Sequence, residues 1–445
     1  PLLNEVWKHV TRLEDPAAYA GAAAVWVEFV CASFGDREVC VLVGDLVRHV
    51  TPGRAYLGLQ ADLGRIGACL VAKYSDFRDL VSLPVFAPFL ETLQGPARQQ
   101  LGKTLLSLFC ALPPGASRDP VALHTALALA RGVHDGLDSL SLGDERREAG
   151  ALVSRFVRSV SFGDDLERQL SFLVECRRFL NNLDVVKEAV VAAVAGLVDR
   201  ANAKVKMRHT RRTLSFVKTC LAFTHTTAPS VADRPRRLHL MLRGAQQALS
   251  LGLLPQCDAL LKAAITTVPD SPPQTLPDEE LLPFLAAFAS ALVAVPGHPE
   301  HGPFFLPKGL LNVIREREWS SPSHKLSAYS LMLSLFSTLA QKRLPSSVEG
   351  TDGNDVLFAR DAAYVEELQE VLDRLTEEVV ATYPSVRQAP PLLDLLNRML
   401  CSARMTPQAC VLAMDVFGAA QRAAASPSER RWLRNTAEFC AGRGG

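Results

Sequence analysis

The chain has 445 residues, of which 48% are hydrophobic and 21% charged. This composition supplies enough apolar side chains for a buried core and excludes a chain that is disordered throughout. The 48 basic and 47 acidic residues leave a formal net charge of +1, which excludes a uniformly basic nucleic-acid binder. Because a single core rarely exceeds about 250–300 residues, we expect two or three globular domains or an array that grows by stacking.

The cellular context follows from apolar stretches and cysteines. The longest apolar stretches, residues 284–295 and 189–198, are shorter than the roughly 18 residues of a membrane span, so no span is expected. The ten cysteines are scattered and form no C-x-x-C motif, which favours free thiols in the cytosol or nucleus. The chain begins at Pro1 without a signal peptide, and we expect it to be a piece of a longer protein.

Helical periodicity is predicted along nearly the whole chain. Residues 38–50 contain β-branched side chains, but the charges of Asp45 and Arg48 favour a helix there. Apolar residues recur at helical spacing in three later segments: Leu166, Leu170 and Leu173; Leu214, Val217 and Leu221; and Leu282, Leu285 and Phe288. No hairpin turn joins alternating runs. The sequence therefore predicts an all-α chain.

Turns rich in proline and glycine separate the helical segments. They occur at residues 113–115, 161–163, 269–277, 296–307, 345–354 and 384–391. The intervals predict about twenty helices in ten antiparallel pairs, and roughly 40 residues per pair is typical of HEAT and armadillo repeats. We predict a HEAT-like α-solenoid of stacked antiparallel helix pairs, continuous over residues 1–445. The alternative is two globular helical domains divided near residues 111–120.

Signatures of catalysis are weak. Gly102-Lys103-Thr104 resembles the end of a phosphate-binding loop, but Ala97 occupies the position of the required glycine and no strand precedes it. The sequence contains neither Gly-x-Ser-x-Gly nor His-Glu-x-x-His. We predict that the protein is not an enzyme, with no catalytic residues and no cofactor.

The run His298-Pro299-Glu300-His301 combines residue types that can bind a metal ion. Prolines and glycines surround it, so the segment is predicted to be a loop rather than a helix face. A zinc site would need at least one further ligand, and no partner sequence supplies one. We therefore expect a structural loop whose histidine side chains hydrogen-bond backbone groups, and no metal.

Charge is distributed unevenly. Residues 200–243 contain eleven Lys and Arg and one acid, Asp233. The candidate basic patch for a lipid or a partner consists of Lys204, Lys206, Arg208, Arg211 and Arg212. Four of these, all but Lys206, could share one helix face and attract phosphate; the alternative is a solvated or protein-facing surface. Residues 352–378 are acidic and form either a docking surface or a solvated face.

An apolar cluster follows the loop. It contains more large side chains than one helix face needs, so part of it could bind a partner. The candidate partner-binding residues are His298, Pro299, Glu300, His301, Gly302, Phe304, Phe305, Leu306, Leu310 and Leu311.

The same residues carry a family resemblance. The run from His298 to Gly302, then Phe305-Leu306, residues 310–314 and Trp319, resembles the vacuolar protein sorting-associated protein 35-like family, in its C-terminal half. Stretches in register elsewhere include Gly44-Asp45-Leu46, Ser161-Phe162-Gly163, Gln169-Leu170-Ser171-Phe172 and Lys262-Ala263-Ala264-Ile265. The resemblance spans most of residues 1–320 and thins after about Lys342.

The resemblance implies an α-solenoid scaffold without catalysis, the large subunit of the retriever complex. In that family the C-terminal half of the solenoid holds a small subunit of metallophosphoesterase fold, and roughly residues 230–445 are the candidate region for that contact in this chain. The N-terminal part of the family, which we expect to be missing from this chain, engages an arrestin-fold subunit. COMM-domain and coiled-coil-domain proteins join the assembly, which recycles membrane cargo from endosomes to the plasma membrane.

The implied location is cytoplasmic and peripheral to endosomes, with indirect membrane association and no nucleic-acid partner. The alternative function is a HEAT-like adaptor that binds RNA or anionic lipid through residues 200–243.

Overall fold

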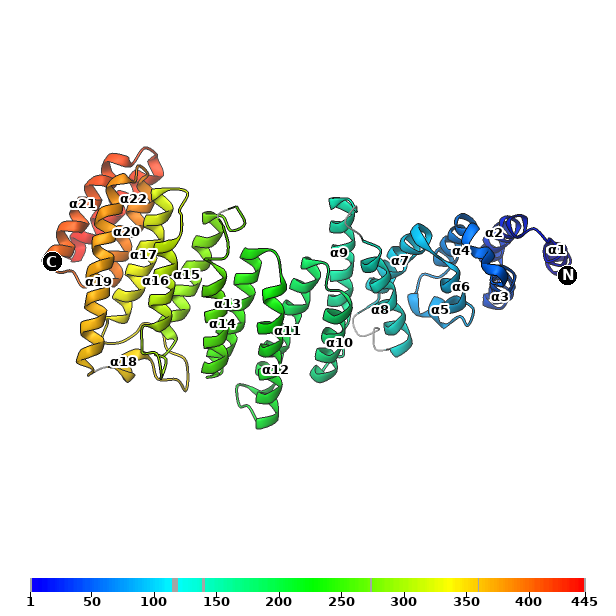
Figure 1. The fold of residues 1–445 in the computed structure, drawn as a ribbon, viewed down its shortest axis with the longest axis horizontal. Coiled ribbons are helices and arrows are strands. Elements are labelled where there is room, and N and C mark those ends of the chain that lie inside the picture. Colours follow the sequence, from blue (N-terminus) through cyan, green and yellow to red (C-terminus); the bar gives the residue numbers. More distant parts are fainter. Residues whose placement is uncertain (1, 114–118, 138–140, 273, 359, 444–445) are drawn as a thin grey trace. The chain divides into compact units, whose positions relative to one another are not determined.

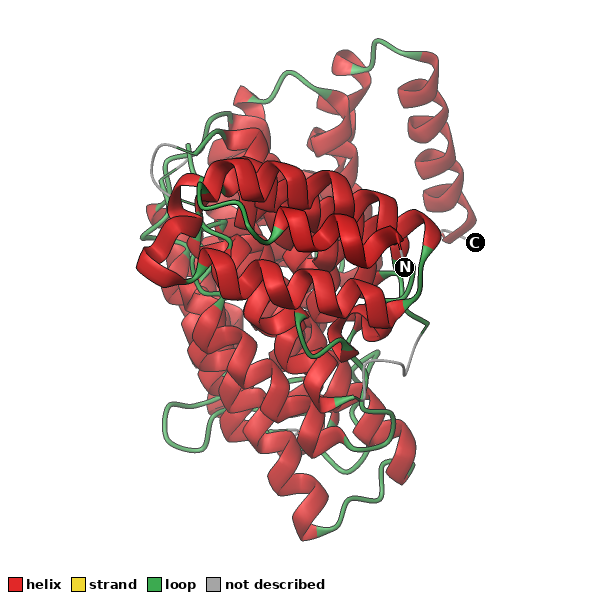
Figure 2. Ribbon diagram, turned by 90° about the vertical axis from the view of Figure 1, so that its right-hand side faces the viewer, coloured by secondary structure: helices red, strands yellow, loops and turns green. Residues whose placement is uncertain are grey.

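The structure is a computed structural model that describes residues 2–113, 119–137, 141–272, 274–358 and 360–443 (Figure 1). Within these ranges the regular elements are helices, and the only β pairing is two isolated bridges, His298 with Gly302 and Val348 with Thr351. Figure 2 accordingly shows helices and loops. The all-α prediction is confirmed. Of the predicted turn at 113–115, Pro114 and Gly115 lie outside the described residues.

The chain divides into two compact units, residues 1–197 and 198–445. The division falls inside helix α11 (Asp184–Val205), not near residues 111–120 as the two-domain alternative supposed. Continuity of one solenoid over residues 1–445 stays a prediction, and each unit is described by itself.

The first unit is a double layer of helices. Its helices are α1 (Leu2–Val10), α2 (Pro16–Ser33), α3 (Asp36–Val50), α4 (Gln60–Lys73), α5 (Phe77–Ser82), α6 (Phe86–Thr92), α7 (Gly95–Cys110), α8 (Pro120–Asp135), α9 (Gly143–Ser159) and α10 (Leu166–Phe179), with a short 3₁₀ helix η1 (Pro52–Gly58). In one layer α2 packs on α4, α4 on α7 and α7 on α9; in the other, α3 packs on α6, and α5 on α6 and α8. Such repeated packing builds a core by addition of pairs.

Four buried phenylalanines connect the core of the first unit. Phe77 and Phe109 lie with ring centroids 5.3 Å apart, Phe109 and Phe156 are 5.6 Å apart, and Phe156 and Phe172 are 5.8 Å apart. They come from α5, α7, α9 and α10 in turn. Tilted and edge-on ring contacts of this kind add about 0.5–1.5 kcal/mol each to the burial of apolar area.

Helix α2 is, among the described helices, the one that is long and apolar enough to cross a membrane by length and composition. Glu28 is the only charged residue in this helix. In the structure α2 packs against α3 and α4, and it buries Tyr19, Ala23 and Val27 in the first unit.

The second unit repeats the double layer. It continues from α11 with α12 (Arg211–Thr227), α13 (Arg234–Ser250), α14 (Leu254–Thr267), α15 (Asp278–Ala294), α16 (Phe305–Glu316), α17 (Pro322–Leu339), α18 (Asn354–Leu357), α19 (Ala362–Thr382), α20 (Ala389–Ser402), α21 (Pro407–Ala423) and α22 (Pro427–Arg443), and with the 3₁₀ helices η3 (Ala228–Ser230) and η4 (Tyr383–Ser385). One layer runs α13, α15, α17, α20, and the other α12, α14, α16. The predicted HEAT-like solenoid of helix pairs is therefore confirmed within each unit.

Several helices begin at the same sequence signal, a capping residue followed by proline. Asp15 accepts hydrogen bonds from the N–H groups of Ala17 and Ala18 before Pro16, and Asp119 caps α8 in the same way before Pro120. Ser321 before Pro322 and Thr406 before Pro407 repeat it at α17 and α21. The side-chain oxygen satisfies a free N–H of the first turn, and proline has no N–H that needs a partner there.

A buried ionic cluster fixes the start of α15 to the turn between α16 and α17. The Asp278 carboxylate accepts hydrogen bonds from Arg317 Nη2 at 3.1 Å, from the Ser320 N–H at 2.8 Å and from the Ser320 hydroxyl at 2.7 Å. Arg317 also donates to the carbonyl of Leu276 at 2.6 Å. The side chains of Asp278 and Arg317 are only 1% and 5% exposed, so the pair is almost fully shielded from water.

Candidate functional site

The loop of residues 296–303 joins α15 to α16 as a small hairpin. The backbone N–H groups of His298 and Gly302 each donate to the other residue's carbonyl, at 3.2 and 3.0 Å. Gly302 has φ +84°, in the left-handed region that glycine adopts at no steric cost. The prediction of a loop at this position is confirmed.

His298 organises the tip of the hairpin. Its Nδ1 accepts hydrogen bonds from the N–H groups of Glu300 and His301, both at 3.1 Å. An accepting Nδ1 carries no proton, so the neutral ring holds its proton on Nε2. The prediction that histidine side chains in this loop hydrogen-bond backbone groups is confirmed for His298.

Residues far along the chain hold the loop in place. The N–H of Gly297 donates to Asn354 Oδ1 at 2.7 Å, and Asn354, which is buried, donates to the carbonyl of Val295 at 3.4 Å. A Cβ on Gly297 would lie 2.8 Å from the Pro303 Cα and 2.9 Å from the Phe358 ring, so only glycine fits there. The loop is therefore clamped between α15 and the segment that contains α18.

An accessible aromatic stack lies on the hairpin. The rings of His298 and His301 are 4.4 Å apart and nearly parallel, and His301 lies 4.6 Å from Phe305. Lys262 Nζ is 4.8 Å from the centre of the Phe305 ring, a cation–π contact. Phe305 remains 40% exposed. A large aromatic ring half open to water, supported from two sides, is typical of an interface anchor.

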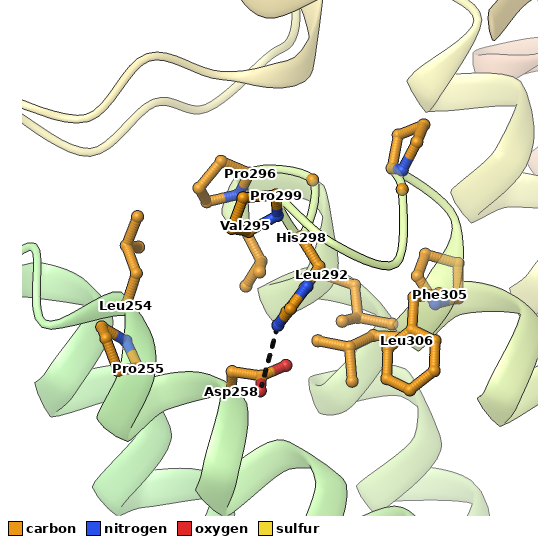
Figure 3. Close-up of a pocket in the computed structure, with 14 residues that line it drawn as sticks. Leu254, Pro255, Asp258, Leu292, Val295, Pro296, His298, Pro299, Phe305 and Leu306 are labelled. Carbon is orange, nitrogen blue, oxygen red and sulfur yellow. Dashed lines mark ion pairs between the residues drawn. The ribbon is translucent and has the colours of Figure 1, made fainter.

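A cavity of about 410 Å³ opens beside the stack (Figure 3). Its lining comes from Leu254, Pro255 and Asp258 of α14, from Leu292 of α15, and from Val295, the loop and Phe305, which Figure 3 shows. Apart from His298 and Asp258 the lining is apolar. A cavity of this size accommodates an apolar side chain of a partner.

Asp258 is the acidic group in the lining of the cavity. Its Oδ2 lies 2.8 Å from Lys262 Nζ and 3.9 Å from His298 Nε2. Its Oδ1 is buried and has no hydrogen-bond partner within the part of the chain that the structure describes. A buried acceptor without a donor costs free energy, which a bound N–H or O–H group would recover.

The structure places the predicted partner-binding residues at different depths. Pro299, Glu300, His301 and Phe305 are exposed, and His298 and Gly302 are half-buried. The remaining four belong to the core: Phe304, Leu310 and Leu311 are at most 1% exposed, and Leu306, 6% exposed, lines the cavity. The accessible part of the predicted surface is therefore the loop and Phe305, on a support of buried side chains.

The predicted basic patch is arranged differently from the expectation. Helix α11 ends at Val205 and α12 begins at Arg211, so Lys204, Arg208 and Arg211 do not share one helix face, and that interpretation was wrong. The cause is a sharp turn in which Lys206 and Met207 have φ of 50° and 62°. All five cations of the patch are exposed.

The acidic stretch is partly paired. Glu367 of α19 forms an ion pair with Lys308 of α16, and Glu378 forms one with Arg315 at 2.7 Å. These pairs join α16 to α19. Most other acids of residues 352–378 are exposed.

Among the described residues, no three His, Cys, Asp or Glu side chains gather in a way that could hold a metal ion. Cys220 and Cys257 are buried and Cys31 is half-buried. Their thiols are poor nucleophiles, because burial raises the pKa of Cys220 and Cys257 to about 12 and that of Cys31 to about 11. Lys103, considered above for a phosphate loop, lies in α7 and pairs with Glu148 at 3.4 Å.

Sequence comparison decides the family. Residues 1–443 match the profile of the VPS35L C-terminal domain. The chain belongs to this family. The resemblance that we expected to thin after Lys342 therefore extends almost to the end of the chain.

Relatives named VPS35 endosomal protein sorting factor-like agree with the family profile. The chain is 34% identical to the Dictyostelium discoideum protein over 98% of its own length and 36% identical to the Homo sapiens protein over 85%. The Drosophila melanogaster protein is 28% identical over 89% of the chain. The matched region spans 46%, 40% and 43% of the lengths of these three relatives, which is less than half of each.

Among solved structures, a circular tandem repeat protein aligns with this chain at 9% sequence identity and a TM-score of 0.32. The alignment covers 97% of this chain and 98% of the repeat protein. A similarity of that size carries no argument about this chain.

Proposed function

We propose that this chain is a non-catalytic scaffold in endosomal protein sorting. The observation that carries the proposal is the match of residues 1–443 to the C-terminal domain of a family whose relatives are named as endosomal sorting factors. The stacked helix pairs of each unit support it, because such arrays present long, stiff surfaces to partners. The proposed location is cytoplasmic and peripheral to endosomes.

The proposed partner of the second unit is the metallophosphoesterase-fold small subunit of the retriever complex. Its proposed contact is the loop at residues 296–303, Phe305 and the adjacent cavity. The clamp by Asn354 supports this, because a loop held rigid loses little conformational entropy on binding. COMM-domain, coiled-coil-domain and arrestin-fold proteins are further proposed partners in the same assembly.

Replacement of Phe305 by alanine is the sharpest test of that contact. We expect about 30-fold weaker binding of the small subunit, because loss of a central aromatic anchor costs about 2 kcal/mol or more. Phe305 is 40% exposed, so the thermal unfolding midpoint should change little. Calorimetric titration of the small subunit into both chains measures the effect.

The matched control is Phe29→Ala in α2, a phenylalanine that is 50% exposed in the first unit. It should leave the affinity unchanged. Equal affinities of the Phe305→Ala and unmodified chains would remove the loop and its cavity from the proposed interface.

A further inference from the structure

A second surface of the same unit is rich in basic side chains. No acidic residue occurs between Asp199 and Asp233, a stretch that holds seven cations: Arg200, Lys204, Lys206, Arg208, Arg211, Arg212 and Lys218. We call residues 204–212 the basic turn. It lies at the end of α11 and the start of α12.

The turn projects its cations outward. Lys206 and Met207 both have a left-handed backbone conformation, which residues other than glycine adopt only at a steric cost. The resulting reversal leaves Lys204, Lys206, Arg208 and Arg211 exposed. Met207, among them, is 51% exposed.

The flanking acids are already engaged elsewhere. Asp199 binds Arg243 at 3.0 Å and Gln247 at 2.6 Å, and Asp233 caps α13 and pairs with Arg236 at 3.4 Å. The structure records no ion pair to a described residue for Lys206, Arg208 or Arg211. The positive end of the α12 dipole adds to the same potential. A basic side chain in the first turn of a helix, such as that of Arg211, is unfavourable for the helix itself.

We propose that the basic turn binds the anionic surface of a phospholipid membrane, with its cations on lipid phosphates and Met207 in the interfacial region. Clusters of Lys and Arg beside an apolar side chain fit such a surface. A nucleic acid fits less well, because single-strand binding uses a groove with aromatic side chains on which bases stack. Residues 204–212 contain no Phe, Tyr or Trp and line neither of the two hollows beside the 296–303 loop. This surface is independent of the small-subunit contact proposed above.

Vesicle flotation of chain 1–445 tests the proposal. The probes are vesicles of phosphatidylcholine alone and matched vesicles that also contain phosphatidylserine and a phosphoinositide. We expect flotation with the anionic vesicles only, and its loss when salt is raised. Combined replacement Lys206→Glu, Arg208→Glu and Arg211→Glu should weaken partitioning at least about 100-fold, from the contribution of each cation near the surface.

The matched control replaces three exposed, dispersed arginines of the first unit by glutamate, Arg37, Arg98 and Arg158. It changes the net charge equally and should retain flotation, and circular dichroism should show both variants helical. Three results would overturn the proposal: no flotation of the unmodified helical chain, equal loss in both variants, or salt-sensitive binding to single-stranded RNA without binding to vesicles.

Discussion

Replacement of Asp278 by alanine is expected to lower the free energy of unfolding by about 3–5 kcal/mol. The reason is that Arg317, with a side chain only 5% exposed, would remain buried without its carboxylate partner. The backbone N–H and the hydroxyl of Ser320 would lose their acceptor at the same time. Urea unfolding followed by circular dichroism measures the difference.

Glu280→Ala is the control for the Asp278 variant. Glu280 is exposed in the first turn of α15, where a carboxylate contributes at most about 1 kcal/mol through the helix dipole. A loss for Asp278→Ala no larger than that for Glu280→Ala would contradict the role assigned to the buried cluster.

The same carboxylate gives a pH dependence with a definite sign. Burial disfavours the charged form of Asp278, but hydrogen bonds from Ser320 and the Arg317 guanidinium outweigh burial and lower its pKa. A pKa lower in the folded than in the unfolded chain stabilises the fold above the unfolded value, about 3.9, and this contribution is lost as the pH falls further. The stability difference between the unmodified chain and Asp278→Asn should be constant from about pH 7 to 5 and shrink below about pH 4.

Phe304→Ala is expected to cost about 3–5 kcal/mol of unfolding free energy. Phe304 is 1% exposed, and its ring stacks on Tyr364 at 4.7 Å and lies 6.3 Å from Phe336. Its removal would leave a cavity between α16, α17 and α19. Thermal and urea unfolding measure the loss.

The neighbouring residue provides the comparison. Phe305→Ala should change stability by less than about 1 kcal/mol while it weakens partner binding, because Phe305 is 40% exposed. If Phe304→Ala proved as stable as Phe305→Ala, the division of this cluster into a buried support and an exposed anchor would be wrong.

Much of the helical architecture could be predicted from the sequence because local signals specify it. The charges of Asp45 and Arg48 within a β-branched run indicated a helix, and α3 spans Asp36–Val50. The glycine and proline content of residues 296–303 indicated a loop, and Gly302 adopts the backbone that requires glycine. Helix periodicity and turn residues act over a few positions, so a single sequence contains them.

The depth of the side chains around the loop could not be predicted, because it depends on distant helices. Phe304 and Phe305 are adjacent and chemically identical, yet α17 and α19 cover one and leave the other open. The prediction that the basic patch lies on one helix face was wrong for a local reason. Lys206 and Met207 adopt left-handed backbone and end α11, although their residue types alone permit the helix to continue.

Three residues central to the site could not be predicted, because they reach the loop from distant parts of the chain. Asp258 and Lys262 reach the loop from α14, and Asn354 reaches it from 57 positions beyond Gly297. The stretch beginning at Lys262 contributed to the family resemblance, but no spacing rule connects it to Phe305. Asp278 and Arg317 likewise pair across 39 positions.

The central claim, a scaffold that holds the small subunit, is tested most directly by calorimetric titration of the metallophosphoesterase-fold subunit into chain 1–445 at low and high salt. We expect binding at one subunit per chain that persists at high salt, because the proposed contact is mainly apolar. Absence of heat and of a complex with a chain that is fully helical would contradict it.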